Sequence, residues 1–212
     1  MLVSTAPLRV VWVSDGLGDA ARVAWIARAA LHGGVRTCVL REPALSDSDY
    51  SSLCATLYPE FEAAGGWLIA HERPALARVG LVHGLHLRAS SLALASERAP
   101  RKAGLVLGVS THSKAELAAA RAHGATYAFL GSVFATSSHE GAHPLGVALA
   151  TELASGAGLL VVAIGGIDQE AARSLCAGPW AGVACIRAIS AAPDPERAAR
   201  ALVAAMAQEG KP

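Results

Sequence analysis

Two stretches near the C-terminus combine glycine, small residues and charge in a pattern that suits anion binding. The apolar run LLVVAI ends in Gly165 and Gly166, and Asp168 follows where it can cap a helix. A second apolar run, AGVACI, leads to Arg187. A glycine turn before a helix leaves backbone N–H groups open, and these groups favour a phosphate. We therefore predict a phosphate-binding turn at Gly165 and Gly166, with the charge of Arg187 at the end of the next apolar run.

Other polar residues also follow apolar runs. Arg41 and Glu42 end the run VRTCVLRE, where they could bind an anion and act as an acid/base pair, or brace each other as an ion pair. His86 lies in LVHGLHL, and it is either a ligand contact or a core histidine with its own partner. Ser110 and His112 are two residues apart, so in an extended chain they face the same side.

Elements that would position these residues alternate along the whole chain. Apolar runs at 9–15, 35–42, 67–72, 81–87, 104–110 and 126–134 precede the two runs above, and segments with helical spacing lie between them. This pattern predicts a single-domain (β/α)8 barrel over residues 1–212, with a doubly wound open sheet as the alternative. In such a barrel the carboxyl ends of all strands meet on one face. Helices are expected at 19–31, from Ser46 with a kink or break at Pro59, at 91–99, 113–124, 147–154 and 194–208.

Composition restricts the partners and the compartment. The formal net charge is +1 with no acidic or basic block, so nucleic acid and membrane surfaces are not expected as partners. The four cysteines form no C-x-x-C pair and are predicted to be buried free thiols. No signal-peptide pattern and no apolar run of the roughly 20 residues that a membrane span needs is present. A cytoplasmic location is therefore expected.

The segment from Gly108 to Ile189 resembles the thiamine-phosphate synthase/TenI superfamily. GVSTHSKAELAAARAHG, LGSVF and LLVVAIGGID carry the resemblance, and VSD, LREP, LIAHERPALA and LHLRASSL extend it more loosely toward the N-terminus. The resemblance implies a (β/α)8 barrel that binds a small phosphorylated thiazole-type ligand in thiamin metabolism. It also implies phosphate binding by Gly165 and Gly166 and by a second turn, Ile186 and Arg187, although a serine is usual at position 187. A homo-oligomer is possible, since members of the family form them.

The synthase branch of this superfamily needs Mg²⁺ and side chains that bind a diphosphate group, because its pyrimidine substrate loses diphosphate. Here Arg41 is retained, but His71 and Glu72 replace an Asn-Asp pair, and His139 replaces a lysine. The run Arg88 to Ser91 replaces the segment that carries an acidic residue. We therefore expect weak Mg²⁺-diphosphate binding. No cofactor is expected, with Mg²⁺ needed only if synthase activity is retained and Glu72 as its one remaining ligand.

The TenI-type thiazole tautomerases lack that metal site, which favours them as the main interpretation. Their catalytic histidine, however, is here Ser132, and a serine has no suitable pKa for proton transfer. Proton transfer would then fall to His112, His139, His86 or Glu42. The catalytic candidates are His112, His139, Glu42 and Ser132, and the expected substrate contacts are Arg41, His86, Ser110 and Thr136. Thiamine-phosphate synthase is one alternative function, and a non-catalytic regulatory barrel is another.

Overall fold

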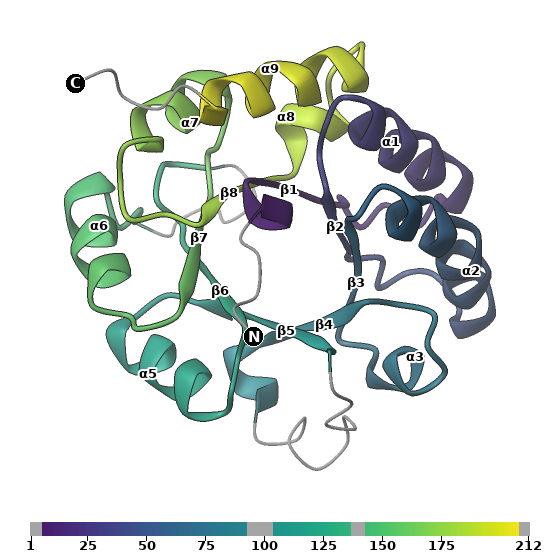
Figure 1. The fold of residues 1–212 in the computed structure, drawn as a ribbon, viewed down its shortest axis with the longest axis horizontal. Coiled ribbons are helices and arrows are strands. Elements are labelled where there is room, and N and C mark those ends of the chain that lie inside the picture. The colour runs from purple at the N-terminus through teal and green to yellow at the C-terminus, as the bar shows by residue number, and fades with distance from the viewer. Residues whose placement is uncertain (1–5, 93–103, 137–142, 208–212) are drawn as a thin grey trace.

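The apolar runs form strands that pair in sequence order into a closed barrel, as Figure 1 shows in a view into the ring of strands. The structure is a computed structural model, and it describes residues 6–92, 104–136 and 143–207. Every pair of neighbouring strands is parallel, and β1 closes the ring against β8. The predicted (β/α)8 fold is confirmed, and the alternative prediction of a doubly wound open sheet was wrong. The strands are β1 (Val10–Val13), β2 (Thr37–Leu40), β3 (Trp67–His71), β4 (Gly84–Arg88), β5 (Val106–Thr111), β6 (Tyr127–Leu130), β7 (Leu160–Ile164) and β8 (Gly182–Cys185).

Helices surround the barrel, because each one buries an apolar stripe against the outer face of the strands (Figure 1). Several begin at a side chain that accepts a hydrogen bond from an N–H of the first turn, as at Asp19, Ser46, Ser113 and Asp168. The described helices are α1 (Ala20–His32), α2 (Asp47–Ala63), α3 (Pro74–Arg78), α5 (Lys114–Ala122), α6 (Val147–Ser155), α7 (Gln169–Leu175), α8 (Arg187–Ser190) and α9 (Pro195–Ala207), with 3-10 turns η1 (Ala6–Leu8) and η2 (Ala89–Ser91).

The strands are buried on both faces, which explains their nearly continuous apolar sequences. Side chains alternate between an inner cluster and an outer one. Val11 and Val13 of β1 belong to the inner cluster, whereas Trp12 between them packs with the surrounding helices. The side chains of the inner cluster fill the barrel. The open end of the barrel, at the carboxyl ends of the strands, therefore lies above a packed core.

Three elements differ from their predicted form. Helix α2 runs through Pro59 to Ala63, so the expected break was wrong. The last apolar run stops being a strand at Cys185, and Arg187 instead opens the short helix α8. The sixth strand ends at Leu130, well before Phe134. The helix expected at 91–99 falls largely outside the described residues.

The cysteines are free, and Cys38, Cys54 and Cys185 are buried as predicted, whereas Cys176 is half-buried. Within the described parts of the chain, no helix combines the length and the apolar character that a membrane crossing requires.

Candidate active site

A cavity of about 930 Å³ lies at the carboxyl ends of the strands, within the usual size range of small-molecule sites. Residues from β1 to β8 and the loops that follow them line it. It brings together most of the residues singled out from the sequence: Arg41, His86, Ser110, His112, Ser132, Thr136, Gly165, Gly166, Ile186 and Arg187. Glu42 is not among the lining residues, and His139 lies outside the described part of the chain.

The glycine turn, Gly165–Gly166, follows β7 and needs both glycines. Their φ angles are +98° and +68°, in the left-handed region that disfavours side chains. A Cβ on Gly165 would lie 2.5 Å from Cβ of Ser132, and one on Gly166 would lie 2.5 Å from the carbonyl oxygen of Ala135. The loop after β6 therefore packs directly on this turn. No backbone acceptor within the described residues takes the N–H of Gly166, so the turn can offer it to an anion.

The start of α8 lies beside the glycine turn on the neighbouring strand, and Ile186, Arg187 and Ala188 line the cavity there. Contacts from β1 and from α1 hold α8 in place. The indole N–H of Trp12 donates to Oγ of Ser190 at 3.0 Å, and Arg22 donates to the carbonyl oxygen of the same serine at 2.9 Å. The two segments thus form one polar corner of the mouth.

His86, from β4, lies in a buried chain of three polar groups. Its Nδ1 is 3.0 Å from the hydroxyl of Tyr127, and its Nε2 is 2.8 Å from Oγ of Ser110. Burial lowers the pKa of His86 well below its ordinary value, and the nearby His71 lowers it further, so the ring is neutral. His86 therefore has its own buried partners, as expected of a core histidine. It also lines the cavity, as expected of a ligand contact.

The burial of Tyr127 selects the tautomer of this histidine. The hydroxyl of Tyr127 is completely buried, and burial raises its pKa, so it keeps its proton. That proton needs an acceptor, and Nδ1 of His86 provides one. Nε2 then carries the ring proton and donates to Ser110, which leaves the Ser110 hydroxyl to donate into the cavity. Sequence reasoning missed Tyr127, because a tyrosine in the apolar run TYAFL looks like ordinary core.

His112 lies just past the end of β5 and is oriented by a backbone group. Its Nδ1 is 2.6 Å from the carbonyl oxygen of Gly131. A carbonyl oxygen only accepts, so Nδ1 of the neutral ring carries the proton and Nε2 keeps its lone pair. His112 is exposed and lines the cavity. It can therefore act as a proton acceptor toward a bound molecule.

Ser132 is the second residue after the end of β6 and lies next to the glycine turn. Its carbonyl oxygen accepts a hydrogen bond from the N–H of Leu145 at 2.8 Å, which ties both ends of the β6–α6 loop together. Thr136 lines the cavity from the same loop. A ligand on the glycine turn would therefore lie next to Ser132.

The predicted acid/base role of Glu42 does not agree with its position. Its side chain is buried, and its two oxygens accept the N–H groups of Gly16 and Gly18 at 3.1 and 2.8 Å. The carboxylate therefore shapes the β1–α1 loop rather than facing the cavity. Within the described residues it also forms no ion pair with Arg41, so the ion-pair alternative was wrong. Anion binding by Arg41, which lines the cavity, stays a prediction.

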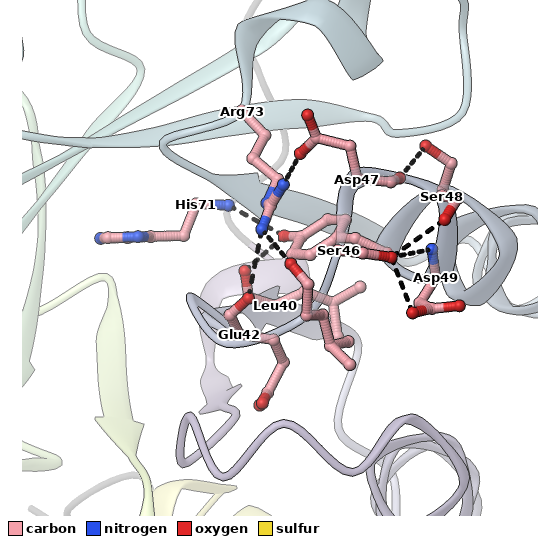
Figure 2. Close-up of polar contacts among 11 residues, drawn as sticks. Leu40, Glu42, Ser46, Asp47, Ser48, Asp49, His71 and Arg73 are labelled. Atoms are coloured by element: carbon pink, nitrogen blue, oxygen red, sulfur yellow. Dashed lines mark hydrogen bonds and ion pairs between the residues drawn. The ribbon is translucent and has the colours of Figure 1, made fainter.

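A second network links the segment after β2 to the end of β3, as Figure 2 shows. The guanidinium of Arg73 pairs with Asp47, donates to the carbonyl oxygen of Leu45 at 2.8 Å and lies 4.4 Å from the ring centre of Tyr50. The Tyr50 hydroxyl donates to the carbonyl oxygen of Leu40 and accepts from the N–H of His71. The ring of His71 points away from this network (Figure 2), and it stacks on His86 with the centroids 6.0 Å apart.

His71 is a cavity residue that sequence reasoning left without a role. Burial lowers its pKa to about 4, Glu72 opposes that shift, and the positive charges of Arg41 and Arg88 add to it. A neutral ring is therefore stable here at physiological pH. Its position at the end of a predicted strand was the available signal.

Glu72 does not offer the setting that Mg²⁺ prefers. Its Oε1 accepts the N–H of Arg88 at 2.7 Å, and its Oε2 accepts the hydroxyl of Ser91 at 2.8 Å. The carboxylate is not among the groups that line the cavity. Across the described ranges, no three His, Cys, Asp or Glu side chains come together as a metal site would require. The residues present therefore do not fit the ion that the synthase resemblance implies.

The fold and this mouth define a class, namely (β/α)8 barrel proteins with a polar cavity at the carboxyl ends of the strands. The family model described as thiamine monophosphate synthase matches residues 10–189 of the chain. The chain belongs to this family, which confirms the superfamily resemblance seen in the sequence.

Curated relatives and a solved structure agree with this assignment. The chain is 35% identical to the thiamine-phosphate synthase of Chlorobium luteolum over 178 residues, which is 84% of each chain. It is also 35% identical to the thiamine-phosphate synthase of Roseiflexus castenholzii over 184 residues, 86% of this chain and 81% of the relative. The structure of thiamine phosphate pyrophosphorylase from Pyrococcus furiosus superimposes with a TM-score of 0.83 at 25% identity, covering 95% of this chain and 96% of that one. These names support a role in thiamin metabolism, and they favour the synthase alternative over the tautomerase.

Proposed function

We propose that the chain is a transferase of the thiamine-phosphate synthase type. It would join a pyrimidine, activated as its diphosphate, to a thiazole phosphate, with release of pyrophosphate. The relatives of this name at 35% identity carry the proposal. The cavity supports it with a place for each part of the two substrates.

The thiazole phosphate would lie on the glycine turn and the start of α8. Gly166 offers an N–H there, and Arg187 adds a positive charge to the same corner. Ser110 would donate a hydrogen bond to the pyrimidine ring, because the chain through His86 and Tyr127 directs its hydroxyl proton into the cavity. Arg41 would face the diphosphate, which leaves with the bonding electrons as the new carbon–nitrogen bond forms.

The test is pyrophosphate release by the purified chain, followed with a coupled assay. Release that requires both substrates supports the transferase. Release with the pyrimidine diphosphate alone would show simple hydrolysis, and no release under any condition would reject the proposal. A non-catalytic barrel would bind thiazole phosphate and convert nothing.

His112 favours a second candidate, proton transfer on a thiazole ring. His112 lines the cavity, and its Nε2 keeps a lone pair because Nδ1–H donates to the carbonyl oxygen of Gly131. Deuterium exchange into a thiazole carboxylate phosphate, measured by NMR, tests this activity. Exchange that His112→Gln abolishes would support it, and exchange no faster than in buffer would reject it.

A further inference from the structure

The cavity wall formed by the ends of β2, β3 and β4 carries positive charge. Arg41 and Arg88 are both exposed residues that line the cavity. Both are close enough to His71, which lies between them in strand order, to disfavour its protonation. Their side chains take part in none of the ion pairs found among the described residues. Two cationic groups thus face the same space, and Asp15, a cavity carboxylate at the end of neighbouring β1, pairs with Arg22 and not with either of them.

The part of this wall on β3 and β4 lies across the mouth from the glycine turn, whereas Arg41, at the end of β2, is two places from β8. In the closed strand order, β4 stands four places from β8, and β3 stands four places from β7. A ligand phosphate on Gly166 and Arg187 would therefore leave the two arginines for a second anionic group. Neutral His71 would fill the space between them and could donate a hydrogen bond to that group.

The acidic side chain near this wall is already engaged. Glu72 is held by the N–H of Arg88 and the hydroxyl of Ser91, and its loop fixes the backbone from which Arg88 extends. A carboxylate that would otherwise attract a cation instead positions an arginine. The resemblance implies a metal ion near this position, and the structure instead offers the guanidinium of Arg88. The planar N–H donors of a guanidinium match the oxygens of a phosphate.

We infer that Arg41 and Arg88 form an anion subsite that binds the diphosphate group of a substrate directly, without a divalent cation. The inference rests on the proposed function for the identity of the anion, and the chemistry it requires is that of a pyrophosphate-like polyanion. The departing diphosphate would be stabilised by two fixed positive charges as its own charge develops.

Binding of inorganic pyrophosphate, measured by isothermal titration calorimetry in EDTA and in excess Mg²⁺, tests the subsite. We expect binding in EDTA, at least tenfold weaker binding by Arg88→Gln, and unchanged binding by the matched control Arg9→Gln. Arg9 is exposed and precedes β1, at the opposite end of the barrel. A melting curve for each variant shows that the fold is retained.

Binding of pyrophosphate that requires Mg²⁺, or that Arg88→Gln leaves unchanged, would overturn the inference. The two proposals fail separately. Metal-free pyrophosphate binding without transferase turnover would reject the function and keep the subsite. Turnover that depends strictly on Mg²⁺, with pyrophosphate bound only in its presence, would reject the subsite and keep the function.

Discussion

The hydroxyl of Ser91 donates to Oε2 of Glu72 across 2.8 Å and joins the ends of β3 and β4. These positions correspond to the two acidic segments that the synthase pattern uses for Mg²⁺. Here one acidic residue is left, and a hydroxyl and a backbone N–H satisfy it. Where the synthase pattern has a metal site, the carboxylate of Glu72 therefore holds the backbone of Arg88 instead.

Restoring a second carboxylate at this corner should make stability depend on Mg²⁺. In Ser91→Asp, two carboxylates would face each other, and we expect a loss of about 1 kcal/mol in EDTA from like-charge repulsion. Excess Mg²⁺ should recover this loss in a thermal melt. The control is Ser90→Asp, which places the same charge on an exposed neighbour. Equal Mg²⁺ responses of the two variants would contradict the assignment of this corner.

Removing the Tyr127 hydroxyl should release the tautomer of His86. Tyr127→Phe takes away the donor to Nδ1, so we expect a loss of about 1 kcal/mol in urea unfolding. The ¹⁵N chemical shifts of His86 should change from an Nε2–H ring to a mixture of tautomers. Tyr58→Phe is the control, because that hydroxyl contacts only exposed Glu62. An unchanged Nε2–H signal in Tyr127→Phe would show that another group directs Ser110.

Replacing Gly166 by alanine should weaken ligand binding by more than its loss of stability can explain. Gly166→Ala would place its Cβ 2.5 Å from a carbonyl oxygen, whereas Gly124→Ala meets nothing within 4 Å. Both glycines have similar positive φ angles, so both variants should lose about 1 kcal/mol from backbone strain. Only Gly166→Ala should weaken binding of thiazole phosphate, by tenfold or more in calorimetry. Equal affinities of the two variants would place the phosphate elsewhere.

The low pKa of His71 should make stability depend on pH. Its pKa is about 4 in the fold and about 6.5 when unfolded, so between these values the unfolded chain binds more protons. The free energy of unfolding should therefore fall as pH drops from 6.5 to 4, by up to about 3 kcal/mol from this group. In His71→Asn, the free energy of unfolding measured with urea should depend less on pH between 6.5 and 4. Replacing the exposed His32 by asparagine should leave this pH dependence unchanged. A profile for His71→Asn identical to that of the parent chain would contradict the assignment.

The barrel and its mouth could be predicted from the sequence because they follow from local patterns. Apolar runs that end in polar residues indicate parallel strands, and in a barrel those ends converge. Arg41, His86, Ser110 and His112, which all line the cavity, can therefore be predicted as site residues from the sequence alone.

The partners of these side chains could not be predicted, because they come from distant segments. Glu42 ends an apolar run just as Arg41 does, but its carboxylate bonds to the loop after β1. Tyr127 resembles core and is paired with His86 across 41 residues. Arg187 was expected at the end of a strand, yet β8 ends at Cys185 and Arg187 is the first residue of α8.

The most direct test of the account is mass-spectrometric detection of the joined product. The purified chain, at a concentration equal to the substrates, would be incubated with the pyrimidine diphosphate and thiazole phosphate, with and without Mg²⁺. The account predicts thiamin phosphate with an equal amount of pyrophosphate, including in EDTA. Intact substrates in both conditions, despite bound thiazole phosphate, would contradict it.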